Sequence, residues 1–336
     1  MAIQQMLLGG SLSIDSLFST DLYTGNAAST PNTQTIVNGI DLTSSNGGLV
    51  WIKSRTDIGN NHFFDTSRGT GKWLIGNTTA GERTDVNTLT SFNSNGFSLG
   101  ADNTHVNRDS VDYVAWTFRK QPRFFDIVEY QGSNVQQTIS HNLGSEPGAM
   151  IIMEKNGGGS GFKWFYHREM ANGSYIFWHD GTFAQYSQWL TIPPTSTDFT
   201  IPNNQYTNTN NGEYIAYLWA HDAVSSFSAD GNSPVIKCGS YYGGNTTAIK
   251  SVSLGFKPQF VIIKKEQSGS QFLVSDSTRG TDNYILASAS TQEDQITGEL
   301  VFTSTGFDIN PTSDPTPAIS TLNSAGKYLY IAVAAP

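Results

Sequence analysis

The hydrophobic positions along the chain follow a pattern typical of β-strands. Apolar residues either alternate with polar ones or form blocks of four to six, and Gly, Asn, Ser and Pro separate these segments. No window of the sequence keeps a helical period. The pattern therefore predicts an all-β fold.

Three sequence features recur in the same order at intervals of about 100 residues. The first is an apolar strand that ends in Lys, found as LVWIKS at 49–54, AMIIMEK at 149–155 and FVIIKK at 260–265. The second is a polar turn that leads to Phe, found as SNGFSLG at 94–100, STDFTIP at 196–202 and STGFDIN at 304–310. The third is a closing Tyr-containing strand, found as DYVAWTF at 112–118, EYIAYLW at 213–219 and KYLYIAV at 327–333.

A unit of about 100 residues with short strands of this kind has the size of a β-sandwich. We expect three tandem β-sandwich-like units, each with its own core. Units two and three open with a strand that unit one lacks in full, DIVEYQG at 126–132 and VIKCGSYYGG at 235–244. The predicted organisation is an extended N-terminal arm at 1–34, unit one at 35–122, unit two at 123–224 and unit three at 225–336.

The predicted arm carries apolar residues but is too short to form a core of its own. It therefore buries these residues on another surface, either as an ordinary strand packed on unit one or as a docking arm for another protein. We favour docking, because an apolar cluster at the terminus is followed by a Gly/Ser break. The candidate docking residues are Ile3, Met6, Leu7, Leu8, Leu17 and Phe18.

Two nearly identical hexapeptides, DTSRGT at 65–70 and DSTRGT at 276–281, lie at the same place in units one and three. We interpret them as structural turns, in which an Arg braces the loop and a Gly takes a positive φ. Unit two lacks the Asp and the Gly-Thr pair, although Arg168 is a candidate substitute for the Arg. The predicted bracing residues are Asp65, Arg68, Asp276 and Arg279.

Two other groups of residues are candidates for catalysis. His167 and Glu169 lie in YHREM as a possible base and its acidic partner, but an exposed loop or strand edge is the simpler interpretation. Glu82 and Asp85 lie in GERTD, where a glycosidase-like pair would need a fixed separation across a cleft. Solvated loop charges are the commoner explanation, and we expect no catalytic residue.

One cluster of residues favours ligand binding. The segments at 177–190 and 203–214 combine aromatic side chains with Asn, Gln and Asp, a mixture suited to stacking on sugars and bonding their hydroxyls. The competing interpretation places these aromatic side chains in the core. The candidate glycan-binding residues are Trp178, Tyr186, Trp189 and Tyr206.

Composition and charge exclude several classes of function. The formal net charge is −9, and scattered Lys and Arg residues disfavour nucleic-acid binding. A single Cys238 rules out an internal disulfide and a Cys-rich zinc site, and the six His residues have no metal-binding spacing. No apolar run approaches the ~20 residues of a membrane-spanning helix. We expect no metal, no cofactor and no membrane insertion.

Several stretches resemble the tail-fibre-type proteins of tailed phages that infect marine bacteria and cyanobacteria. These stretches are MAIQQMLLGG, LFSTDLYTGN, NGIDLTSSNGGLVWIKSRT, DTSRG, LTSFNSNGFSLG, YVAWTFRKQPRFFDIVEYQG and ISHNLGSEPGAMII. The resemblance covers essentially the whole chain. It implies a virion structural protein, assembled in the host cytoplasm, with a terminal part anchored in the particle and repeated β-domains that face the host.

Combined with this resemblance, the expected function is host attachment without catalysis. The expected partners are other virion proteins, contacted through the arm, and a host surface glycan or receptor; a homotrimer follows from analogy with phage fibres. A capsid decoration or a tail accessory protein without receptor binding is the alternative. A polysaccharide depolymerase and a free carbohydrate-binding module are further options.

Overall fold

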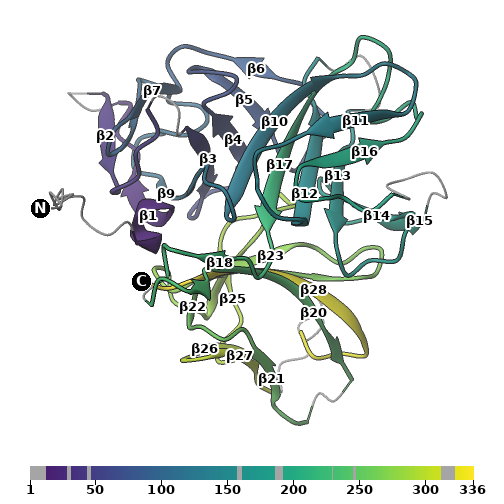
Figure 1. Ribbon diagram of the computed structural model, residues 1–336. Helices are drawn as coiled ribbons and strands as arrows, with labels where there is room; N and C mark the ends of the chain where they lie inside the picture. The colour runs from purple at the N-terminus through teal and green to yellow at the C-terminus, as the bar shows by residue number, and fades with distance from the viewer. Residues whose placement is uncertain are drawn as a thin grey trace, which may run out of the picture.

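The structure is a computed structural model that describes residues 13–28, 32–43, 47–156, 161–185, 192–228, 230–244, 247–311 and 322–336 (Figure 1). These ranges contain 28 strands and one short 3-10 helix, η1 (Ile14–Ser16). The chain is all-β, as its hydrophobic pattern predicts.

The first unit consists of two antiparallel sheets packed face to face. The larger sheet has the strand order β1-β9-β3-β4-β5-β6 and the smaller sheet the order β2-β8-β7. Ile36 and Phe97 of the smaller sheet share one core with Val50 and Ile52 of the larger sheet. The strands are β1 (Phe18–Thr24), β2 (Gln34–Val37), β3 (Gly48–Ser54), β4 (His62–Asp65), β5 (Lys72–Ile75), β6 (Arg83–Thr84), β7 (Leu89–Asn93), β8 (Gly96–Leu99) and β9 (Asp112–Arg119).

The second unit repeats this arrangement. Its larger sheet has the order β10-β17-β12-β13-β14-β15, and β11 pairs with β16 in the smaller sheet. The strands are β10 (Phe125–Gln131), β11 (Gln137–Ser140), β12 (Pro147–Glu154), β13 (Lys163–His167), β14 (Ser174–Phe177), β15 (Phe183–Gln185), β16 (Asp198–Ile201) and β17 (Glu213–Ala220).

The third unit follows a short hairpin of β18 (Val224–Ser225) and β19 (Ser233–Pro234). Its sheets have the orders β20-β28-β22-β23-β24-β25 and β21-β27-β26. The strands are β20 (Ile236–Gly243), β21 (Lys250–Ser253), β22 (Pro258–Lys265), β23 (Leu273–Asp276), β24 (Asn283–Leu286), β25 (Asp294–Gln295), β26 (Leu300–Thr303), β27 (Gly306–Ile309) and β28 (Gly326–Ala334).

The common topology makes residues of the three units equivalent, position by position. In each unit a Tyr of the first strand pairs with a Tyr of the last strand, and the two rings stack with centroids 4.9–5.1 Å apart. The pairs are Tyr23 and Tyr113, Tyr130 and Tyr214, and Tyr241 and Tyr328. This register defines the equivalent positions used below.

The first unit begins earlier than the sequence predicts. Strand β1 pairs with β9 from Phe18 opposite Phe118 to Thr24 opposite Asp112, as β10 pairs with β17 and β20 with β28. The predicted arm at 1–34 is therefore wrong in its C-terminal part, because β1 is the first strand of unit one. Its central residues, Ser-Thr-Asp, are only half-buried, so the hydrophobic pattern is weak there.

Units one and three each have a core of their own between their two sheets, as the sequence predicts, but the units are not independent of one another. One large core contains residues of all three units, with the three larger sheets directed towards the centre of the molecule (Figure 1). Phe118 of unit one lies with its ring centroid 5.9 Å from Trp219 of unit two and 5.7 Å from Phe260 of unit three. Strands β3 and β12 are buried at every position because one face meets the smaller sheet and the other meets this shared core.

Candidate functional site

The two predicted glycan-binding residues that the structure describes, Trp178 and Tyr206, are not fully exposed. Trp178 is fully buried in the shared core, with its ring centroid 4.3 Å from that of Phe272. Tyr206 is half-buried and packs 5.5 Å from Trp164. The assignment of Trp178 is therefore wrong, because this side chain is a contact between units. Tyr186 and Trp189 lie outside the described residues.

The structure describes two of the six predicted docking residues, Leu17 and Phe18. Leu17 and Phe18 are buried, and the Phe18 ring lies 4.8 Å from Phe118 and 5.1 Å from Phe260. These two residues are not free to bind another protein, so their assignment to a docking arm is wrong. Ile3, Met6, Leu7 and Leu8 lie outside the described residues.

The two hexapeptides form the same buried ion pair. The Arg68 Nε donates to Asp65 Oδ2 at 2.6 Å, and the Arg279 Nε donates to Asp276 Oδ2 at 2.6 Å. All four side chains have no exposed surface. The following glycines, Gly69 and Gly280, have φ values of 86° and 89°, as the predicted turn requires.

Each ion pair also receives a hydrogen bond from the neighbouring unit. The Tyr217 hydroxyl of unit two donates to Asp65 of unit one at 2.8 Å. The Trp116 indole N–H of unit one donates to Asp276 of unit three at 3.0 Å. Burial opposes the charge of the Arg68 guanidinium, but Asp65 beside it keeps its pKa above the usual value. The turns therefore brace the contacts between units as well as their own loops.

In unit two a different pair replaces Asp and Arg. His167 is the last residue of β13, as Asp65 is of β4, and Met170 stands three residues later. Arg168, the substitute suggested by the sequence, is half-exposed and lies 3.7 Å from Glu169. It therefore does not take the place of Arg68. His167 is buried, and its Nε2 lies 3.1 Å from the backbone oxygen of Tyr330 in unit three.

The two candidate catalytic pairs, His167 with Glu169 and Glu82 with Asp85, do not form catalytic sites. The His167 Nδ1 accepts a hydrogen bond from the backbone N–H of Glu169, at 3.2 Å, rather than facing its carboxylate. Asp85 caps its own loop through the N–H and side-chain amide of Asn87. Glu82 lines a different cavity from Asp85. Neither pair has the geometry of two groups acting on one bond.

Further hydrogen bonds join the three units in a closed circle. The segment between the third strand and the start of the fourth strand of each unit contacts the region after the fifth strand of the preceding unit, and unit three precedes unit one in this circle. Burial lowers the pKa of the Lys163 ammonium in one such contact to about 7. The bonds are Gly59 N–H to Ser290 O at 2.9 Å, Lys163 Nζ to Ala80 O at 2.9 Å, and Ser268 Oγ to Phe183 O at 2.7 Å.

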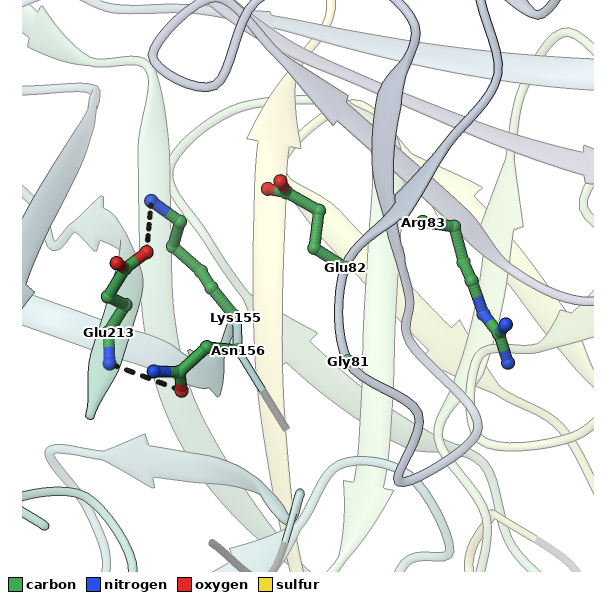
Figure 2. Close-up of a pocket in the computed structure, with 6 residues that line it drawn as sticks. All are labelled: Gly81, Glu82, Arg83, Lys155, Asn156 and Glu213. Atoms are coloured by element: carbon green, nitrogen blue, oxygen red, sulfur yellow. Dashed lines mark hydrogen bonds and ion pairs between the residues drawn. The ribbon is translucent and has the colours of Figure 1, made fainter. Parts of the chain in front are cut away.

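The best candidate site in the described part of the chain is a polar cleft of about 420 Å³ between units one and two. Figure 2 shows Glu82 pointing from its loop towards the space beside Lys155, whereas Arg83 points away. The Lys155 ammonium lies 3.7 Å from Glu213 and also bonds Glu129. The cleft is lined by Gly81, Glu82, Arg83, Lys155, Asn156 and Glu213.

Both signs of charge are present in this cleft. Burial opposes the charge of the Lys155 ammonium, but Glu129 and Glu213 hold its pKa above the usual value. The side-chain oxygen of Asn156 accepts a hydrogen bond from the Glu213 N–H at 3.4 Å. Such a cleft can bind a small polar or charged group. Among the described His, Cys, Asp and Glu residues, no group of three is arranged to hold a metal ion.

Sequence reasoning missed this cleft because its residues come from three separate segments. The sequence pairs Glu82 with Asp85 as a candidate acid pair, and it places Lys155 only at the end of a predicted strand. An alignment of the three units would have provided a signal, since Lys155 is equivalent to Arg55 and Glu82 to Glu293. The backbone bonds from Glu82 N–H to Lys155 O and from Glu293 N–H to Arg55 O show this equivalence.

Comparisons with known proteins identify a family for the chain. A family model described as "Domain of unknown function (DUF7483)" matches residues 15–336, which include β1 and all three units. A comparison with curated proteins gave no match. Among the described residues, no helix is long and apolar enough to cross a membrane.

Proposed function

We propose that this chain, which belongs to the DUF7483 family, is a non-enzymatic structural protein of a phage virion, of the tail-fibre type, that mediates attachment to the host. The resemblance of nearly the whole sequence to such fibres supports the assignment. The proposed location is the virion, with assembly in the host cytoplasm.

One structural observation carries the proposal, namely the closure of three β-units around a shared core. The recurring ionisable groups of the units, such as Asp65 with Arg68 and Asp276 with Arg279, are buried in contacts that brace the turns and the boundaries between units. A body of this kind holds its surface loops in fixed positions, which suits adhesion and assembly. Attachment through several copies would strengthen weak contacts, and we propose a homotrimer.

The proposed anchor in the particle is the segment 1–12, because Ile14 begins the 3-10 helix and Phe18 begins the first strand of unit one. Ile3, Met6, Leu7 and Leu8 lie in this segment, and they keep the apolar character that motivated the docking hypothesis. The proposed partner of this segment is another virion protein, such as a tail or adaptor protein. The proposed partner of the three-unit body is a host surface glycan or receptor.

Two measurements test the proposal together. An antibody against the purified protein is applied to purified phage particles, and the fluorescently labelled protein is applied to host cells. We expect labelling of the tail and saturable binding to cells, with heat-unfolded protein as the control. Labelled particles without cell binding would instead indicate a decoration or accessory protein. Cell binding without any label on the particle would indicate a free binding module.

The enzyme alternative has its own test. Purified protein is incubated with host envelope polysaccharide, and new reducing ends are measured over time. We expect no increase above the heat-unfolded control. A time-dependent increase that scales with protein concentration would overturn the non-enzymatic assignment and favour a depolymerase.

A further inference from the structure

Two of the contacts between units contain equivalent glutamates, but the side chains that bind these glutamates differ. Glu82 of unit one and Glu293 of unit three each precede the short edge strand of their sheet, β6 and β25. Each donates its backbone N–H to the next unit, Glu82 to Lys155 O at 2.7 Å and Glu293 to Arg55 O at 2.9 Å. The backbone therefore places both carboxylates at the same point of their interface.

At the contact between units three and one, two guanidinium groups surround the carboxylate. The Arg55 Nε and Nη2 donate to the two oxygens of Glu293 at 2.8–3.2 Å. The Arg279 Nη1 donates to the same carboxylate at 3.1 Å. Burial counts against ionisation of the Glu293 carboxyl, but Arg55 and Arg279 hold its pKa below the usual value. A glutamate at this point can therefore bind two guanidinium groups at once.

At the contact between units one and two, the corresponding cation is directed elsewhere. Lys155, the equivalent of Arg55, bonds Glu129 and lies 3.7 Å from Glu213. Glu129 stands opposite Ile215 in β17, where unit one has Leu22 opposite Val114 in β9. Unit one therefore has no acid at the position that attracts Lys155 in unit two.

This arrangement leaves the Glu82 carboxylate without a hydrogen bond from the part of the chain that the structure describes. Its Oε2 is buried and has no such partner, and the same holds for the Arg68 Nη1 that lies 3.8 Å away. Lys72 comes no closer than 4.0 Å. The other oxygen, Oε1, is not buried and also has no hydrogen bond from the described residues, so a donor that enters the cleft can bind it.

The cleft of about 420 Å³ is lined by both Glu82 and Lys155, which is the equivalent of Arg55 (Figure 2). We propose that this cleft binds a guanidinium group, such as the side chain of an arginine in another protein, in the position that Arg55 occupies in the equivalent contact. A guanidinium forms strong charge-assisted hydrogen bonds with a carboxylate, and Glu213, 3.7 Å from Lys155, adds a second acidic group to the cleft. This inference does not depend on the proposed function.

The test measures binding of agmatine, a small alkylguanidinium, to the full chain by isothermal titration calorimetry. We expect a dissociation constant on the order of 1 mM, and no binding of the neutral analogue N-butylurea. Glu82→Gln should weaken agmatine binding by about tenfold or more, since it removes the negative charge of the acceptor. The matched variant Glu293→Gln should change the agmatine affinity by less than about twofold, because its carboxylate is already occupied.

A second variant fills the site from within the chain. Glu129→Leu combined with Lys155→Arg recreates the pair found in unit one, and the new Arg should reach Glu82. We expect this variant to lose agmatine binding and to unfold at a higher temperature than the wild type. Equal agmatine affinity in the wild type, Glu82→Gln and the double variant would overturn the proposal. Absence of binding to the wild type, or tighter binding of glucosamine than of agmatine, would also overturn it.

Discussion

The Tyr217 hydroxyl of the second unit donates a 2.8 Å hydrogen bond to the buried carboxylate of Asp65 in the first unit. The equivalent of Tyr217 in unit one is Trp116, which donates to Asp276. In unit three the equivalent residue is Ile331, whose side chain has no hydrogen-bond donor. In unit two, which unit three contacts, the position of Asp65 is occupied by His167. A buried Asp is therefore found only at the two positions where the neighbouring unit supplies a hydrogen-bond donor. This agrees with the cost of leaving a buried carboxylate unpaired.

Replacing Tyr217 with Phe tests this relationship. The variant removes the donor to Asp65 while keeping the aromatic ring in the core. We expect the free energy of unfolding to fall by about 1–3 kcal/mol, because a buried carboxylate loses one of its hydrogen bonds. Urea unfolding followed by circular dichroism measures the change.

The matched control is Tyr242→Phe, since the Tyr242 side chain is exposed. We expect this control to alter the free energy of unfolding by no more than about 0.5 kcal/mol. Equal midpoints for Tyr217→Phe and the wild type would show that the hydroxyl contributes nothing, and that Arg68 alone compensates the Asp65 charge.

Sequence reasoning was strongest where one segment determines its own structure. The strand pattern predicts the all-β fold, and the hexapeptide at 65–70 predicts a turn with Gly69 at positive φ. Strand β1 was missed because Ser19-Thr20-Asp21 interrupts its apolar pattern. The shared core was missed because a fully apolar strand such as β3 does not reveal what covers its second face.

The candidate sites were harder to predict because they depend on which segments meet. A tryptophan such as Trp178 is suited both to sugar binding and to a hydrophobic core. Its contact with Phe272 in the structure identifies the core role. Glu82 is distinctive only beside Lys155, which lies in another unit. No local pattern specifies that contact, since it follows from the way the three larger sheets pack.

We expect the buried histidines to make the stability of the fold decrease in acid. Burial lowers the pKa of His167 to about 3, against about 6.5 in an unfolded chain. Between these values the unfolded state binds the additional proton, so the stability falls as the pH decreases from about 6.5 towards 3. We expect His167→Gln to reduce this slope by up to ~1.4 kcal/mol per pH unit, because glutamine does not titrate.

Urea unfolding at pH 4, 5, 6 and 8 measures this slope. His62 also has its pKa lowered to about 3 by burial, so the single variant retains part of the dependence and a double variant with His62→Gln should flatten it further. The glutamine amide can still donate to Tyr330 O, which limits the cost at pH 8. Parallel curves for the wild type and both variants between pH 4 and 6 would contradict the prediction.

Trp178→Ala distinguishes a core role from a binding role. The side chain is fully buried between units, so truncation should lower the free energy of unfolding by about 3–5 kcal/mol. Trp178→Phe should cost less, because it keeps an aromatic ring near Phe272. Thermal unfolding measures both. A Trp178→Ala protein with wild-type stability but without cell binding would restore the glycan-binding assignment.

The anchor hypothesis is tested by separating residues 1–12 from the folded body. Removal of these residues should leave the unfolding midpoint unchanged, because β1 begins at Phe18 and η1 at Ile14. Phe18→Ala should instead cost about 3–5 kcal/mol, since its ring packs on both Phe118 and Phe260. If the segment docks in the particle, the truncated protein fails to enter virions during infection while Phe18→Ala, grown at low temperature, still enters. Truncated protein that enters virions at the wild-type level would show that the three-unit body attaches through another surface.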